Sequence, residues 1–304
     1  MLVVDAVRDA CARISAGASF VTIDGERLEG YAAELSRARP SHDPEAHYLE
    51  GTAEDRTAFF VTLDAINFGS GWWPTIRKRP GQSGYFTLAT SLAERFRAHG
   101  PWSARQLAAI DARELAATLG QDPGHELMKL YAWALADVGE RVERLYAGSF
   151  AALVEAAAGS AVRLVESLAA WPSFLDVSVY RARPAPFFKR AQLLAADLVY
   201  AGAAELDDLD RLTIFADNVV PHVLRVDGVL RYEPALAARI DAGEPIEHGS
   251  QEEVELRACA VHACERLARA AGLTAAEVDY ALWSRGRGAT YKERPRHRAR
   301  CTAY

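Results

Sequence analysis

The sequence contains no apolar run that approaches the roughly 20 residues needed to cross a bilayer. Its first residues, Met1 to Asp5, place no basic stretch before a short apolar one, so we expect neither a secretory signal nor a membrane partner. Cysteine is scarce, and Cys259 and Cys264 lie five positions apart, which is the spacing of neither a redox pair nor a usual zinc site. We therefore predict reduced thiols in a cytoplasmic protein.

The short fingerprints of common nucleotide-binding and hydrolytic sites are also missing. The chain has no GxGxxG after a strand, no P-loop, no HExxH and no GxSxG. These absences exclude no activity, but they remove the simplest assignments.

A global excess of positive charge is lacking as well, since the net charge is −6. Proteins that bind duplex DNA neutralise many phosphates and usually have a basic domain, so we expect no duplex partner. Basic residues do gather locally at 77–79 and 292–300. Each cluster is either a solvated face or a small anionic site, such as one for a single phosphate.

Hydrophobic residues make up 50 % of the chain and charged residues 25 %, which is the balance of a globular protein with a sizeable core. Alanine- and leucine-rich segments with a period near 3.6 residues predict a mostly α fold. Without a clear linker, we expect a single helical domain over 1–304 or two closely packed helical lobes. The predicted helices span 4–16, 52–66, 84–98, 123–146, 148–170, 187–203, 250–270 (beginning in a Ser250–Glu253 capping box) and 275–286.

Two stretches interrupt the helical pattern with Asp-Gly between short apolar runs, the strongest local signal for a β-hairpin. One is centred on Asp24 within 20–28, and the other on Asp227 within 224–231. We predict two small hairpins attached to a helical body.

The segment from Leu212 to Pro221 places an acid in an apolar stretch, just before a predicted helix start. If Asp217 were the N-cap, its carbonyl would need the amide N–H of the fourth helical residue, which is Pro221 and has none. Capping by Asn218 instead puts Pro221 in the first turn, where it donates nothing anyway. Asp217 is then one residue outside the helix and free to face a pocket, although a purely structural role stays open.

Two other segments carry side chains that suit either a ligand or the core. Trp72 and Trp73 lie in a glycine-rich loop with Tyr85 soon after, and they either sandwich a planar ring or anchor the interior. Lys189 opens an apolar helix and either extends to solvent or reaches an anion.

The last long predicted helix carries Asp279, Tyr280 and Trp283, with the acid and the indole one turn apart on one face. His47 stands alone, and a lone histidine is more often structural than functional.

Several of these motifs together resemble the queuosine salvage family, the queuosine 5′-phosphate N-glycosylases. The matching stretches occur in order and span nearly the whole chain after His47. They are 67–88 (NFGSGWWPTIRKRPGQSGYFTL), 189–198 (KRAQLLAADL), 212–224 (LTIFADNVVPHVL), 248–258 (HGSQEEVELRA), 279–283 (DYALW) and the tail 294–304.

The resemblance implies a hydrolase without metal or cofactor that cleaves the N-glycosidic bond of queuosine 5′-monophosphate and releases queuine for tRNA modification. It also implies a helical body similar to that of helix-hairpin-helix DNA glycosylases. Asp217 would be the catalytic carboxylate, with Phe215 stacking beside it. Ser284 stands where the family often has an acid, and Arg296 precedes His297 where a second histidine is common. The residues expected to bind the substrate are His47, Trp72, Trp73, Tyr85, Lys189, Phe215, Asn218, Asp279, Tyr280, Trp283 and Arg298.

These residues fit the implied chemistry. Cleavage passes through an oxocarbenium-like sugar, which the Asp217 carboxylate would stabilise or capture. A 7-deazapurine lacks N7, so the leaving base must be stabilised through its pyrimidine edge, whose N–H donors match a carboxylate such as Asp279. The aromatic loop would clamp the ring, and Lys189 or a tail arginine such as Arg298 would hold the 5′-phosphate.

Two rival functions differ in their expectations. A DNA base-excision glycosylase of related fold should be basic over a wide face, and the net charge of −6 counts against it. A non-catalytic helical scaffold should bury Asp217 and the Trp72-Trp73 loop in the core, with no pocket between them.

Overall fold

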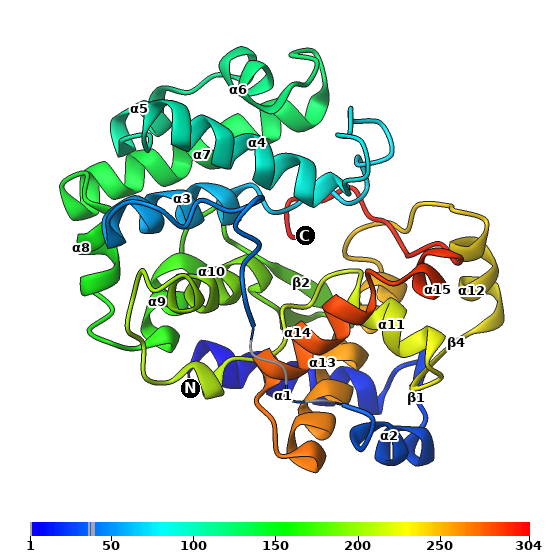
Figure 1. Ribbon diagram of the computed structural model, residues 1–304. Helices are drawn as coiled ribbons and strands as arrows, with labels where there is room; N and C mark the ends of the chain where they lie inside the picture. The colour runs from blue at the N-terminus through cyan, green and yellow to red at the C-terminus, as the bar shows by residue number, and fades with distance from the viewer. Residues whose placement is uncertain (1, 36, 38–39) are drawn as a thin grey trace.

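The computed structural model describes residues 2–35, 37 and 40–304, and most of these are helical (Figure 1). The mostly α fold predicted from the sequence is confirmed. No helix within the described residues is both long and apolar enough to cross a membrane. The elements in chain order are α1 (Val3–Ala16), β1 (Val21–Ile23), α2 (Gly25–Ala32), α3 (Ala53–Ala65), α4 (Gly84–His99), α5 (Ala104–Ala109), α6 (Ala112–Leu119), α7 (Glu126–Tyr146), α8 (Phe150–Glu155), α9 (Ala161–Ala169), β2 (Val177–Tyr180), β3 (Arg183–Pro186), α10 (Lys189–Tyr200), the 3₁₀ turn η1 (Leu209–Arg211), α11 (Val220–Val226), β4 (Leu230–Tyr232), α12 (Pro234–Asp241), α13 (Gln251–Ala271), α14 (Ala275–Arg285) and α15 (Ala289–Lys292).

The helices pack in two groups. In the first, α7 packs against α3, α5, α6 and α8, and α4 packs against α3 and α6. In the second, α13 is central and packs against α1, α2, α11 and α14, while α10 joins the groups through α3 and α9. The first group lies above the second in Figure 1, and the C-terminal tail runs between them. One contiguous cluster of buried apolar side chains, from Val4 to Leu282, extends through both groups.

The central helix α13 is buried although it carries charged side chains. It begins at Ser250, whose hydroxyl accepts a hydrogen bond from the Glu253 amide (3.2 Å), and it ends at Gly272 in the left-handed region (φ 64°). In a capping box the Glu253 carboxylate would accept from the amide of Ser250. Here it accepts from the amide of the preceding residue, Gly249 (3.1 Å). Glu253, Glu255 and Arg257 are each 0 % exposed, so their charges must be satisfied inside the protein.

The prediction that the two Asp-Gly segments form separate hairpins is wrong. Strand β1 pairs antiparallel with β4, which joins Val21 to Tyr232 across the sheet, so each segment supplies one strand of a single sheet. The Asp24 carboxylate accepts from the Arg27 amide (2.9 Å) and caps α2, while Asp227 ends α11. Asp-Gly therefore stands at helix ends here: the Asp24 side chain satisfies a free amide at the start of α2, whereas Gly228 takes a positive φ (80°) after α11.

A hairpin does occur at a place where the sequence gives no turn signal. Strands β2 and β3 pair antiparallel around a two-residue turn at Arg181 and Ala182. Both turn residues have positive φ (47° and 61°), the conformation that two-residue hairpin turns require and that Gly or Asn normally supplies.

The single helix predicted over 148–170 is divided into α8 and α9. The chain leaves the helical region at Ala158 and Gly159, whose φ angles are 47° and 76°. Asp208 explains the break, because its carboxylate accepts from the Ser160 hydroxyl and the Ala161 amide at the start of α9. A contact with a residue 47 positions away thus overrides the local helix preference of an alanine-rich stretch.

Candidate active site

A cavity of about 1030 Å³ opens between the two groups of helices. Its walls come from α4, α10, α14, the segment before α11, the loop after α3 and the C-terminal tail. The scaffold alternative predicted no pocket between Asp217 and the tryptophan loop, and this cavity contradicts it. The predicted site residues that line the cavity are His47, Trp73, Tyr85, Lys189, Phe215, Asp217, Asn218, Asp279, Tyr280, Trp283 and Arg298.

Trp72 is the predicted site residue that the structure places outside the cavity. Its indole is 4 % exposed and packs in the core, where Nε1 donates to Glu126 Oε2 (2.7 Å). Trp73 lines the cavity and lies against the start of α4, so closely that a Cβ at Gly84 would be 2.5 Å from the indole Cγ. The adjacent tryptophans therefore divide between core and cavity, and they do not sandwich a ligand as a pair.

Asp217 occupies a tight turn before α11 in which its own side chain binds the backbone. Oδ1 accepts from the amides of Val219 (2.7 Å) and Val220 (3.2 Å). The prediction that Asn218 caps this helix is wrong, because its Nδ2 donates instead to the carbonyl of His297 in the tail (3.0 Å). Asp217 Oδ2 accepts no hydrogen bond from any residue in the described ranges, so this oxygen is available to a ligand in the cavity.

Asp279 reaches the same region from α14. Its Oδ1 accepts from the Phe215 amide (2.9 Å), which fixes the carboxylate beside the segment that carries Asp217. Burial, and secondly the charge of Asp217, raise the pKa of Asp279 well above its usual value. Ser284, at the position where related chains were expected to have an acid, also lines the cavity.

Lys189 is the buried cation of this acidic centre. The side chain is 5 % exposed, and Nζ donates to the backbone carbonyl of Asn67 (3.0 Å). Burial lowers the pKa of Lys189, while the carboxylates of Asp217, Asp64 and Asp279 act in the opposite direction. The ammonium therefore lies among the carboxylates and does not extend to solvent.

A second buried cation, Arg257, holds the backbone beside Asp217 and, through Asp176, beside Lys189. Its Nε donates to the carbonyl of Ala216 (3.1 Å), next to Asp217. Its two terminal nitrogens donate to the two carboxylate oxygens of Asp176 (3.0 and 2.6 Å), and Asp176 Oδ2 also accepts from the Lys189 amide (3.0 Å). One bidentate ion pair thus ties the start of α10 to the turn before α11.

Aromatic side chains form one wall of the cavity. The rings of Tyr280 and Trp283 stack (6.5 Å, 27°), and the ring of Tyr85 meets Trp283 edge-on (6.3 Å, 88°). The guanidinium of Arg287 lies over Phe86 (4.9 Å) and Trp283 (5.4 Å). Such a wall suits a planar ligand, since flat rings offer contact area and cation–π contacts at low entropic cost.

His47 supports this wall and does not act as an acid near neutral pH. Burial lowers its pKa to about 4. Its Nδ1 lies 3.0 Å from both the amide nitrogen and the carbonyl oxygen of Asp43, and its Nε2 lies 2.8 Å from the Tyr85 hydroxyl. The ring is thus held on both sides and fixes the position of the Tyr85 hydroxyl.

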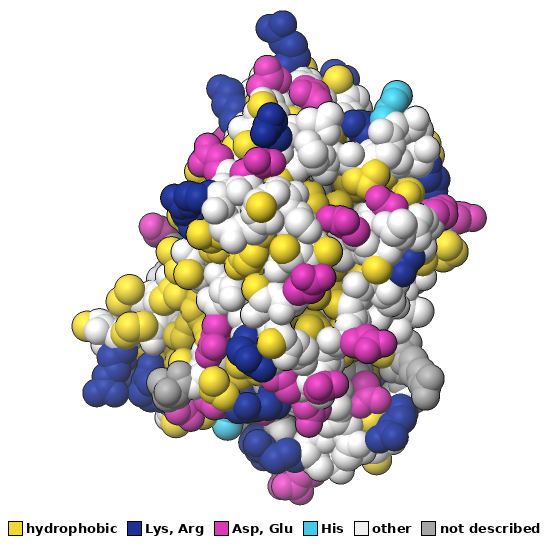
Figure 2. Space-filling model, turned by 90° about the vertical axis from the view of Figure 1, so that its left-hand side faces the viewer, with side chains coloured by type: hydrophobic (Ala, Val, Ile, Leu, Met, Phe, Trp, Pro, Cys, Tyr) yellow, Lys and Arg dark blue, Asp and Glu magenta, His cyan; other side chains and the backbone are white. Residues whose placement is uncertain are grey.

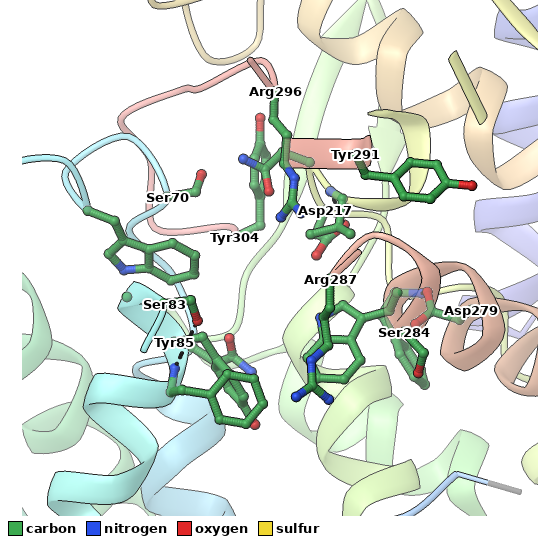
Figure 3. A pocket seen from close by; sticks show the side chains of 18 of the residues that line it. Ser70, Ser83, Tyr85, Asp217, Asp279, Ser284, Arg287, Tyr291, Arg296 and Tyr304 are labelled. Atoms are coloured by element: carbon green, nitrogen blue, oxygen red, sulfur yellow. Dashed lines mark hydrogen bonds between the residues drawn. The ribbon is translucent and has the colours of Figure 1, made fainter. Parts of the chain in front are cut away.

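The tail supplies side chains that sequence reasoning did not place in the site. Arg296 projects toward Asp217 in Figure 3, with Tyr304 beside it, and all three line the cavity. Arg296 donates to the Gly286 carbonyl (2.5 Å), whereas the guanidinium of Arg298 has no partner among the described residues. The Tyr304 hydroxyl is buried without a hydrogen-bond partner in the described chain.

Glycines explain how the tail reaches the cavity. The Gly69 amide donates to the Tyr304 carbonyl (3.0 Å). A Cβ at Gly71 would lie 2.5 Å from the carbonyl oxygen of Ala299, so only glycine lets the tail pass this close to the loop. The two glycines after Phe68 in the long motif thus seat the tail, a role that the sequence pattern alone did not reveal.

Comparisons with known proteins agree with one another. A family model described as "Queuosine salvage protein" matches residues 46–304. A Sphaerobacter thermophilus protein named queuosine 5′-phosphate N-glycosylase/hydrolase is 36 % identical over 310 aligned residues, which cover 96 % of this chain and 95 % of that protein. A Dictyostelium discoideum protein of the same name is 30 % identical, over 82 % of this chain and 78 % of its own. A Nematostella vectensis protein of that name is also 30 % identical, over 77 % and 71 %.

Proposed function

The chain belongs to the queuosine salvage protein family, and from this premise we propose that it is an N-glycosidase that hydrolyses queuosine 5′-phosphate to queuine and ribose 5-phosphate. The observation that carries the proposal is the Asp217 carboxylate, which lines the cavity with Oδ2 unengaged. Water supplies a hydroxyl to C1′ of the ribose and a proton to the departing base. Release of queuine by the purified protein tests the proposal.

Asp217 is the residue that we propose acts on the sugar. As the C1′–N bond breaks, positive charge develops on the ribose, and a fixed carboxylate stabilises that charge or captures C1′. The two amides that bind Oδ1 hold the carboxylate still, so little reorganisation is needed when the charge appears.

Lys189 has a different proposed role from the phosphate contact expected of it. Its ammonium lies among Asp217, Asp64 and Asp279, and it opposes the rise that burial causes in the pKa of Asp64 and of Asp279. We propose that Lys189 offsets part of the negative charge of this buried site, and that the phosphate contact belongs to the tail.

Asp279 is the proposed acceptor for the N–H donors of the base. Replacing Asp279 with Ala is expected to weaken queuine binding by about 1–3 kcal/mol, since two donors of the buried ring edge lose their partner. Asp279→Asn should weaken binding similarly, because it retains the acceptor for the Phe215 amide but turns an NH₂ toward the base.

Calorimetric titration with queuine measures the effect, and Asp210→Ala, which removes an exposed acid outside the cavity, is the matched control. An unchanged dissociation constant in both Asp279 variants would mean that the base binds elsewhere.

The 5′-phosphate is proposed to bind the basic side chains of the tail. The protein should prefer queuosine 5′-phosphate over queuosine by about ten- to a hundredfold in kcat/KM, the effect of one or two charge-assisted contacts. Arg298→Ala should reduce the ratio of kcat/KM for queuosine 5′-phosphate to kcat/KM for queuosine by about tenfold. Turnover of the nucleoside should stay unchanged. Binding energy from a phosphate that does not react can also orient the ribose, so kcat as well as KM should respond.

The matched control for this comparison is Arg300→Ala. Arg300 is two residues further along the same tail, but its guanidinium lies over the core indole of Trp72 (5.8 Å) and does not line the cavity. Equal efficiency of the wild type on nucleotide and nucleoside would contradict a phosphate site in the tail.

The DNA glycosylase alternative expects a wide basic face, which the face seen in Figure 2 does not have. On the face seen in Figure 2, acidic and basic side chains are interspersed, and no broad basic field appears. Together with the net charge of −6, this favours a small nucleotide over a duplex.

A further inference from the structure

One face of α10 forms a wall of the cavity over most of the helix. Lys189, Leu193, Asp197 and Tyr200 all line the cavity, and their spacing places them on one side of the helix. At about 1.5 Å per residue, Asp197 lies roughly 12 Å along the axis from Lys189. The wall therefore begins beside Asp217 and ends at a second carboxylate, which the proposed reaction does not use.

Asp197 is a buried acid whose cationic neighbour, Lys189, is shared with other carboxylates. The residue is 8 % exposed, and within the described residues no group donates a hydrogen bond to its carboxylate. His42 Nε2 is 4.0 Å from Oδ1, too far for a hydrogen bond, and burial lowers the pKa of His42, so this ring brings no charge near neutral pH. Burial also raises the pKa of Asp197 to about 7.

Asp64 reinforces the negative charge behind Asp197. It is 0 % exposed, and its Oδ1 accepts from Asn67 Nδ2 (3.2 Å) while Oδ2 has no partner in the described chain. A buried carboxylate without a partner is costly unless something neutralises it. Lys189 does not neutralise the pair fully, because its ammonium is shared with Asp217 and Asp279.

The charges on the tail and on α10 therefore differ in sign, while the guanidinium of Arg287 lies over the aromatic wall and Lys78 also lines the cavity. Arg296 has Asp217 and Arg298 as its charged neighbours, whereas the charged neighbours of Asp197 are Lys189 and Asp64. The tail side of the reacting centre is basic, and the C-terminal half of α10 is acidic. A ligand that matches this cavity carries an anion at one end and a cation at the other.

Building on the proposed function, we propose that Asp197, backed by Asp64, binds a protonated amine on the substituent of the base and so selects an amine-bearing 7-deazaguanine over a neutral one. Queuosine 5′-phosphate has this charge pattern, since the substituent at C7 of its base carries a secondary amine and its ribose carries the phosphate. With the pyrimidine edge held by Asp279, the substituent extends along α10 toward Asp197. The ammonium then donates to the carboxylate in a buried, charge-assisted hydrogen bond.

The test compares two ligands that differ in one group. 7-Aminomethyl-7-deazaguanine and 7-hydroxymethyl-7-deazaguanine have the same ring and nearly the same size, but only the first is cationic. The wild type should bind the amine about ten- to a hundredfold more tightly, as expected for one hydrogen bond between charged groups. Asp197→Asn should reduce that ratio to less than about threefold, mainly by weakening binding of the amine, and should leave the hydroxymethyl affinity within about twofold.

The ligand pair separates recognition from folding. Asn is close to Asp in shape and removes a buried charge, so the thermal unfolding temperature of the variant should not fall. Equal affinity of the wild type for the two bases would overturn the proposal without any variant, and so would an Asp197→Asn protein that weakens both ligands alike. The proposed function is tested separately, by release of queuine from queuosine 5′-phosphate. If the protein releases queuine but binds the two bases with equal affinity, only the proposed role of Asp197 is refuted.

Discussion

Asp217→Asn is expected to lower kcat on queuosine 5′-phosphate by at least about a hundred- to a thousandfold, the range seen when a group that stabilises transition-state charge is removed. The variant should still fold. Asn retains the oxygen that accepts from the Val219 and Val220 amides, so the turn before α11 keeps its hydrogen bonds. What changes is the second oxygen, which becomes an uncharged NH₂ facing the cavity and can neither stabilise nor capture a cationic sugar.

Steady-state release of queuine by wild type and variant measures this effect, with the dissociation constant of queuine as a check on the binding site. Asp208→Asn is a matched control, because Asp208 also accepts hydrogen bonds at the start of a helix, from Ser160 and Ala161, but lies outside the cavity. A kcat near that of the wild type in Asp217→Asn would show that Asp217 only shapes the turn.

The second large effect is on stability. Arg257→Met should lower the free energy of unfolding by about 3–5 kcal/mol, the usual consequence of removing one partner from a buried ion pair. Arg257 and Glu253 are 0 % exposed and Asp176 is 4 % exposed, so the loss of the guanidinium leaves the buried Asp176 carboxylate without its cation and leaves Glu253 with His248 (3.5 Å) as its cationic partner. The backbone carbonyl of Ala216 also loses its donor, which loosens the turn that carries Asp217.

Urea unfolding at neutral pH gives the free energy, and the slope with urea shows whether the transition stays two-state. Glu94→Gln is the control, because it breaks an exposed ion pair with Arg79 and should change stability by less than about 1 kcal/mol.

Adding Asp176→Asn to Arg257→Met should recover part of the lost stability, because the unpaired carboxylate of Asp176 is then replaced by a neutral amide. A loss below about 1 kcal/mol in Arg257→Met would contradict the account of this pair.

Helices were predictable because their signals are local. The period of apolar residues and the cap at Ser250 depend only on neighbours in the chain, and the structure has helices over 251–271 and 275–285. Strand pairing was not predictable in the same way. Asp24 and Asp227 carry the same turn signal, yet their segments pair with each other over about 200 residues because tertiary contacts decide what each aspartate binds.

The candidate site was partly predictable for a similar reason. Asp217, Asp279 and Lys189 stand in long motifs, and all three line the cavity. The sequence pattern does not distinguish Trp72 from Trp73. In the structure, Trp72 packs in the core and Trp73 lines the cavity. Asp197 gave no signal of its own, and Arg296 could not be distinguished from the other basic residues of 292–300, since their importance depends on which side of a helix or tail meets the cavity.

The central claim is that this chain cleaves the glycosidic bond of queuosine 5′-phosphate. The most direct measurement is chromatographic detection of free queuine and ribose 5-phosphate after the purified wild-type protein is mixed with queuosine 5′-phosphate, with the Asp217→Asn protein in parallel. The account predicts equal amounts of the two products with the wild type and at least about a hundredfold slower release with the variant. Intact queuosine 5′-phosphate after prolonged incubation with folded wild-type protein, or equal rates for the two proteins, would contradict it.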